Sequence, residues 1–113
     1  MIIPFDTMEE KAHQSFKGGE GTFFNKVVQD EHNKILNGRL APGSSIGLHT
    51  HEGNSEIIFI LSGKGKALYD GTYEPVHAGV CHYCPMGHSH SLINDSDEDL
   101  VFCAVVPQHP VAP

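Results

Sequence analysis

Short runs of apolar and β-branched residues, separated by turn residues, dominate the chain. Twelve glycines and seven prolines among 113 residues interrupt these runs. Short runs rich in Val, Ile, Phe and Tyr and bounded by Gly, Pro, Asn and Asp predict strands joined by tight turns, as in a β-sandwich or β-barrel. The predicted strands cover residues 22–29, 35–41, 46–51, 56–61, 66–70, 73–76, 80–84, 89–94 and 100–105.

Only the N-terminal segment carries a helical signal. Residues 7–14 begin with Thr7, which can cap a helix, and place Glu9 and Glu10 in the first turn. A Gly-Gly pair then ends the candidate helix. The organisation is that of a single domain, with a short N-terminal helix or arm (1–24), a β core (about 25–106) and a proline-rich tail (107–113) that we expect to be poorly ordered.

Composition narrows the classes of function. Seven Lys and Arg residues stand against fourteen Asp and Glu residues, which gives a formal charge of −7 and argues against a nucleic-acid partner. No apolar run approaches the roughly 20 residues that span a bilayer. The first residues lack the basic and apolar regions of a signal peptide, so we expect a cytoplasmic protein without a membrane partner.

Histidine is the unusual residue of this composition, with nine copies. Histidine is the commonest metal ligand in proteins, so this number favours a metal site. The three cysteines are an odd number and do not form a disulfide framework. Cys81 and Cys84 differ by three on a predicted strand, so they point to opposite faces and cannot readily pair.

Three histidines and one glutamate stand at positions that suit a metal site. His49 and His51 are two apart on a predicted strand, so both imidazoles point to the same face. Glu56 follows a tight turn, and His90 comes just after the Pro85-Met86-Gly87 turn. In a small antiparallel barrel these side chains would converge on one divalent ion, with two positions left for water or substrate. The ligand set suits Fe, Mn, Ni, Co or Zn and does not select among them.

The spacing of these residues resembles the two motifs of the cupin family. The first motif, G(X)5HXH(X)3-4E(X)6G, is matched by Gly43, His49, His51, Glu56 and Gly63. The second motif, G(X)5PXG(X)2H(X)3N, is matched by Gly79, Pro85, Gly87, His90 and Asn94. Fifteen residues separate the two motifs, a spacing typical of compact microbial single-domain cupins.

The resemblance implies a fold and a ligand set. The fold is an all-β, double-stranded β-helix of the jelly-roll type, in a single cupin domain. The implied ligands of one divalent transition metal ion are His49, His51, Glu56 and His90. Small cupins also commonly form homodimers, by pairing the N-terminal strand or packing one sheet of each barrel. Phe23, Phe24, Val27 and Val28 are candidates for such a contact.

Residues outside the motifs supply candidates for a substrate pocket. Arg39 either binds a substrate carboxylate or forms a surface ion pair. On the strand over 80–84, His82 or Tyr83 lines the pocket, and strand parity does not decide which. Glu52 and Asn54 flank the ligand loop, where either residue is an outer contact, a gate or part of a simple turn. The apolar set Ile58, Ile60, Leu92 and Phe102 is expected in the barrel interior or in sheet packing. In the interior this set, with Ile58 as a candidate pocket residue, would make the pocket largely hydrophobic around one polar metal centre.

Two classes of function remain open on this reading. A metal-dependent enzyme acting on a small organic molecule is the first, with dioxygenase, decarboxylase, isomerase and lyase chemistry all compatible with the resemblance. The sequence shows no further acid–base pair, so no catalytic residue is assigned. The alternative is a non-catalytic module that binds or senses a small ligand.

Overall fold

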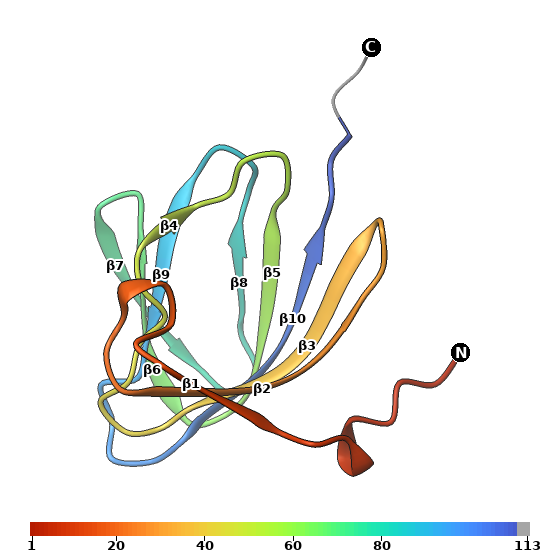
Figure 1. Ribbon diagram of the computed structural model, residues 1–113. Helices are drawn as coiled ribbons and strands as arrows, with labels where there is room; N and C mark the ends of the chain where they lie inside the picture. Colours follow the sequence, from red (N-terminus) through yellow and green to blue (C-terminus); the bar gives the residue numbers. More distant parts are fainter. Residues whose placement is uncertain (111–113) are drawn as a thin grey trace.

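The computed structural model describes residues 1–110 and shows two antiparallel sheets that face each other (Figure 1). One sheet has six strands in the order β1-β2-β3-β10-β5-β8, and the other has four in the order β4-β9-β6-β7. This is the predicted all-β barrel of the jelly-roll type. The strands are β1 (Lys11–Gln14), β2 (Thr22–Gln29), β3 (Asn33–Leu40), β4 (His49–Thr50), β5 (Glu56–Ser62), β6 (Lys64–Tyr69), β7 (Thr72–His77), β8 (Cys81–Cys84), β9 (Ser89–Ile93) and β10 (Leu100–Pro107).

The predicted helix over residues 7–14 is wrong. The chain forms a short 3₁₀ turn, η1 (Phe5–Thr7), and then strand β1, which pairs with β2. The Thr7 hydroxyl donates back to the carbonyl of Pro4 (3.2 Å) instead of capping a helix. Pairing with the edge of a formed sheet satisfies the backbone of this segment, and such tertiary contacts override a weak helix propensity. The N-terminal segment is therefore an arm. Within residues 1–110, no helix is long and apolar enough to cross a membrane.

The strand predicted over 46–51 is much shorter in the structure, where only His49–Thr50 pair as β4. The residues before it make only isolated contacts with β9, such as the bond from the amide of Ile46 to the carbonyl of Leu92 (2.9 Å), and also contact the loop between β1 and β2. The amide of Gly47 donates to the carbonyl of Phe16 (3.0 Å), in a second 3₁₀ turn, η2 (Phe16–Gly18). A Cβ atom on Gly47 would lie 1.9 Å from the carbonyl oxygen of Lys17, so only glycine permits this approach.

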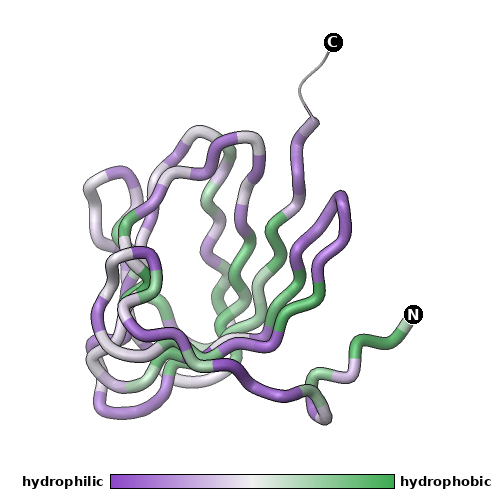
Figure 2. The backbone as a smooth tube through the Cα atoms, in the orientation of Figure 1, coloured by the Kyte–Doolittle hydropathy of each residue, from purple (hydrophilic) through white to green (hydrophobic). Residues whose placement is uncertain are grey.

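Inward-facing side chains of both sheets form the core. Residues alternate along β10, where Leu100, Phe102, Ala104 and Val106 are buried. The ring of Phe102 stacks on that of Phe23 at 5.9 Å between centroids. Figure 2 shows the apolar stretches of the facing strands in green and the polar hairpin between β2 and β3 in purple. The predicted interior set is confirmed, with exposed fractions of 0–3% for Ile58, Ile60, Leu92 and Phe102.

The side chains of β2 that were expected in a dimer contact point to opposite faces of the sheet. Phe23 is 3% exposed and belongs to the core, and Val27 packs against that core. The expectation for Phe23 is wrong, because inward parity buries its side chain, whereas Val27 is partly buried and its part in a dimer contact stays a prediction. Phe24 has the opposite parity and lies under Arg39, whose Cζ is 3.7 Å from the ring centroid. Val28 shares the outward parity of Phe24.

The beginning of the predicted tail is part of the fold. Pro107 ends β10, and Gln108 forms an isolated bridge with Asn54. The amide of His109 donates to the carbonyl of Gly53 (2.8 Å), and its Nε2 lies 2.8 Å from the Ser55 hydroxyl. The expectation of poor order is therefore wrong for residues 107–109, because this stretch pairs with the loop before β5. The last three residues, 111–113, lie outside the described part.

Candidate metal centre

Four polar side chains meet inside the barrel near one end. His49 on β4 and His90 on β9 face each other directly in the strand register. His51 follows two residues later and points the same way, and Glu56 begins β5. Gly87 has a φ of 88°, in the left-handed region that favours glycine, within the turn that leads into β9. The tight turns thus bring residues of three strands to one point.

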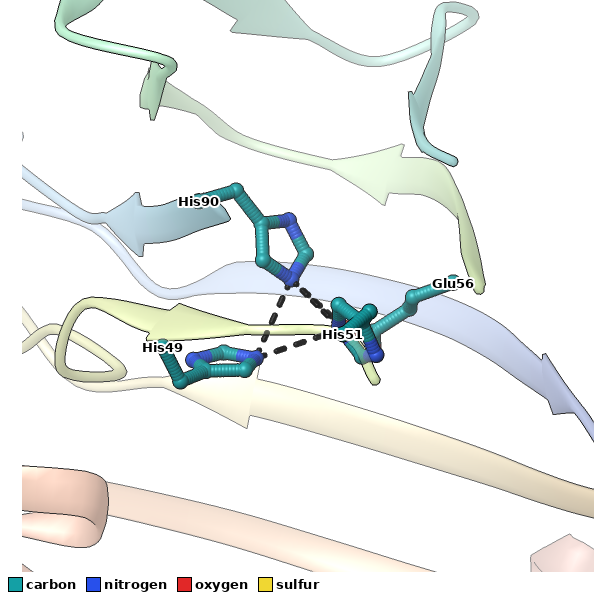
Figure 3. Close-up of side chains that lie close together, drawn as sticks. All are labelled: His49, His51, Glu56 and His90. Atoms are coloured by element: carbon teal, nitrogen blue, oxygen red, sulfur yellow. Dashed lines mark hydrogen bonds and ion pairs between the residues drawn. The ribbon is translucent and has the colours of Figure 1, made fainter. Parts of the chain in front are cut away.

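The distances between the four side chains are short (Figure 3). Nε2 of His90 lies 2.9 Å from Nε2 of His51 and 3.1 Å from Nε2 of His49. Oε1 of Glu56 lies 3.0 Å from Nε2 of His90, 3.3 Å from Nε2 of His51 and 4.0 Å from Nε2 of His49. All four ligand atoms lie within 4.8 Å of one another. His90 is the deepest of the four, with 1% of its surface exposed.

The other ring nitrogens show which way each imidazole presents its lone pair. Nδ1 of His49 donates to the carbonyl of Gly47 (2.7 Å), and Nδ1 of His51 donates to Oδ1 of Asn54 (2.8 Å). A carbonyl or amide oxygen only accepts, so the proton sits on Nδ1 in both rings. Nε2 of each neutral ring is therefore left as an acceptor that faces the centre.

A chain of two hydrogen bonds fixes the tautomer of His90 in the same way. Nδ1 of His82 donates to Oε1 of Glu74 on β7 (2.8 Å), which leaves Nε2 of His82 as an acceptor. Nδ1 of His90 lies 3.0 Å from this Nε2 and donates to it. Burial lowers the pKa of His82, which favours the neutral ring that this chain requires. All three Nε2 atoms of the centre thus carry lone pairs.

The electrostatics of the cluster favour a positive charge at its centre, either a proton on an imidazole or a metal ion. Burial raises the pKa of Glu56, but without a metal the hydrogen bonds from protonated His51 and His90 outweigh burial and lower that pKa to about 2, so the carboxylate is ionised. Burial lowers the pKa of His49 to about 4, whereas the Glu56 contact raises the pKa of His51. Three lone pairs and one negative charge that converge in a buried place repel one another unless a positive charge lies among them.

The donor set fits a divalent transition metal ion. Two ligand atoms about 2.1 Å from one ion and at right angles to each other lie about 3.0 Å apart. Three of the distances given above, from 2.9 to 3.1 Å, match this value. Nitrogen and carboxylate donors in this combination suit Fe, Mn, Ni, Co and Zn alike. The side chains of His49, His51, Glu56 and His90 are thus positioned for a metal.

A cavity of about 290 Å³ opens beside the centre. Its walls combine apolar side chains of the interior with polar side chains, so the expectation of a largely hydrophobic pocket is wrong. The lining comprises Phe16, Lys17, Phe23, Gln29, Lys34, Leu36, Ile46, His49, His51, Asn54, Glu56, Phe102, Val106 and Gln108.

The structure places the predicted pocket residues apart from one another. Arg39 lies on the outer face, where it pairs with Glu10 (2.8 Å) and Asp99 (3.0 Å), so its pocket role is wrong and the surface ion pair is right. The side chain of Tyr83 is outward and 54% exposed, so it does not line the pocket either.

His82, on the inward face of β8, reaches the centre as a contact of His90. Ile58, also inward and 1% exposed, lies in the core and does not line the cavity. Asn54 is the outer contact of His51, so the simple turn interpretation is insufficient. Cys81 is exposed and Cys84 buried, as their opposite parity predicts.

Comparison with known proteins agrees with the fold. The family model described as "Cupin domain" matches residues 38–106. A protein of Thermotoga maritima named oxalate-binding protein is 44% identical over 112 residues, which span 94% of this chain and 93% of that protein.

Solved structures give the same result. A crystal structure of a predicted oxalate decarboxylase from Thermotoga maritima superposes with a TM-score of 0.90 at 31% identity, over 96% of this chain and 99% of that one. A cupin 2 conserved barrel domain protein from Salinispora arenicola superposes with a TM-score of 0.75 at 25% identity, over 96% and 88% of the two chains. On the matched residues, the barrel and the sequence identity, the chain belongs to the cupin family.

Proposed function

We propose that the protein holds one divalent transition metal ion through His49, His51, Glu56 and His90, and binds a small organic acid at that ion. The convergence of three imidazole lone pairs and one carboxylate beside a cavity supports this function. A bound metal would supply a Lewis acid for the carboxylate or carbonyl oxygens of a ligand. The name of the Thermotoga maritima relative, oxalate-binding protein, supports an acidic ligand.

Whether the bound acid is also turned over separates two candidate functions. Dioxygenase, decarboxylase, isomerase and lyase chemistry all fit a metal with open positions. The cavity lining favours the non-catalytic alternative, a binding or sensor protein. Apart from the four candidate ligands, its titratable residues within the described chain are Lys17 and Lys34, which do not form an acid–base pair with each other.

Elemental analysis by plasma mass spectrometry tests the metal. About one Fe, Mn, Ni, Co or Zn ion per chain, absent from His51→Ala, is the expected result. Calorimetry with oxalate then compares the metal-loaded and metal-free proteins, and oxalate incubated under air and under reductant is assayed for products. Oxalate that binds and is recovered unchanged supports a binding protein. A wild-type protein that takes up none of the five ions contradicts the proposal.

We further propose a homodimer that packs through the outer face of the six-stranded sheet. Phe59, Leu61 and Tyr83 are 48–54% exposed there, on β5 and β8. The outward positions of β10 beside them, Val101, Cys103 and Val105, are also apolar. Monomeric proteins rarely expose a contiguous apolar face of this kind. The outward positions of β5, β8 and β10 form an uncharged patch, which suits contact with its own copy across a two-fold axis, since no like charges then oppose each other.

A further inference from the structure

One row of inward-facing residues crosses the six-stranded sheet at the open end of the barrel. Lys34 on β3 pairs in register with Gln29 on β2 and with Val106 on β10. On the next strand, Ile57 of β5 faces Val105, so Glu56 stands beside Val106 in the same row. The four residues of the row line the cavity: Gln29, Lys34, Val106 and Glu56. The row therefore begins at the candidate metal centre and ends at a lysine and an amide.

The position of Lys34 is unusual for a lysine. Strand parity places it inside the barrel with Leu36, and it is half-buried. The ion pairs within residues 1–110 give it no carboxylate partner, although the chain carries twice as many acidic as basic residues. Gln29 and Gln108 line the same end of the cavity and offer neutral amides. A half-buried lysine that lines a cavity and forms no ion pair favours an anionic ligand.

The distance between Glu56 and Lys34, at the two ends of the row, indicates the length of the anionic ligand that would fit. Strand β10 lies between β5 and β3, so two strand spacings separate Glu56 from Lys34. Adjacent strands are about 4.8 Å apart, which gives roughly 10 Å between the two backbones. The cavity between them has apolar walls that include Leu36 and Phe102. A ligand that reaches from one end to the other needs two polar groups joined by an apolar link.

We propose that Lys34 binds the second carboxylate of the ligand, so that the site selects dicarboxylates longer than oxalate. One carboxylate faces the metal centre, the carbon link packs on the apolar walls, and the other carboxylate accepts hydrogen bonds from the Lys34 ammonium group. This inference rests on the proposed binding of a small organic acid. Lys17 also lines the cavity, but it is exposed on the η2 loop and does not belong to the row.

The test is calorimetric titration of metal-loaded protein with oxalate, succinate, glutarate and the monocarboxylate butyrate. The variants are Lys34→Met, Lys34→Arg and Lys17→Met, with Lys64→Met on β6 as the control that removes the same charge from an exposed strand position. Metal content and melting temperature are measured for each variant. We expect glutarate or succinate to bind the wild type more tightly than oxalate and butyrate do.

In Lys34→Met the affinity for the longer dicarboxylate should fall about tenfold, as for one lost charge-assisted hydrogen bond, with metal content and butyrate binding unchanged. Lys34→Arg should retain most of the affinity. Equal losses in Lys34→Met and Lys64→Met, a loss in Lys17→Met alone, or tightest binding of oxalate would overturn the role of Lys34 and leave the proposed function standing. A wild type that binds none of these acids in a metal-dependent way would overturn both.

Discussion

The imidazoles of His82 and His90 are joined across the two sheets, with 3.0 Å between Nε2 of the first and Nδ1 of the second. His82 belongs to an edge strand of the six-stranded sheet, and His90 belongs to the four-stranded sheet. The rings stack at 5.2 Å between centroids. A partner that orients a metal-binding histidine tunes the metal affinity as well as the geometry, so His82 and Glu74 are positioning residues for the proposed centre.

Replacement of His82 is expected to weaken metal binding. His82→Phe removes the acceptor for Nδ1 of His90, so affinity for the metal should fall by about 10- to 100-fold. Glu74→Gln keeps a hydrogen-bond acceptor but removes the charge, so the loss should be smaller. Competition with a chromophoric chelator measures both affinities, and circular dichroism checks the fold. Tyr83→Phe, on the outward face of the same strand, is the control. Wild-type affinity in both inward variants would contradict a positioning role.

Acid is expected to release the metal, because imidazole must be neutral to bind it. The raised pKa of His51 means that this ring takes up a proton first as the pH falls. The pKa of His49, about 4, keeps that ring neutral to lower pH. Metal affinity should therefore fall with decreasing pH, with the loss beginning at His51. Dialysis at steps from about pH 8 to about pH 5, followed by elemental analysis, measures it. Retention that does not change over this range would argue against a histidine-rich site.

Gly47→Ala is expected to displace the η2 loop. The added Cβ would meet the carbonyl oxygen of Lys17 at 1.9 Å, and a backbone atom cannot move away alone. Such overpacking costs about 1–3 kcal/mol of stability, which urea unfolding measures. Gly43→Ala meets nothing within 4 Å but has a φ of 75°, so it isolates backbone strain from the clash. Equal stability of Gly47→Ala and the wild type would show that the loop yields freely.

Phe59→Glu is expected to convert the proposed dimer into a monomer. The substitution places a carboxylate in the uncharged patch of β5, β8 and β10, where a two-fold axis would bring two such charges together. Light scattering should then give half the wild-type mass. Tyr73→Glu, at a 58% exposed aromatic on β7 of the other sheet, should leave the mass unchanged. A wild-type mass near 12.3 kDa would contradict the dimer itself.

The features that could be predicted from the sequence are those that depend on local patterns, such as the alternation of side chains along a strand. The two-residue spacing of His49 and His51 depends only on strand alternation, so their convergence was predictable. The helix over 7–14 was not, because β1 exists only through its pairing with β2. Lys34 was missed since the predicted strand began one residue after it, although its parity with Leu36 would have placed it inside. Glu74 was missed because its hydrogen bond to His82 joins two strands whose relative placement no local pattern encodes.

The contact between Gly47 and the η2 loop means that two parts of the chain, the arm and the barrel, together form the site. The candidate metal ligands stand in the barrel, whereas Phe16 and Lys17, which form one wall of the cavity, come from the arm. Substitution in the arm can therefore reshape the wall without disturbing the ligands. A scaffold of this kind lets new ligand preferences evolve, or be engineered, around an unchanged ion, provided that residue 47 stays small enough for the arm to close.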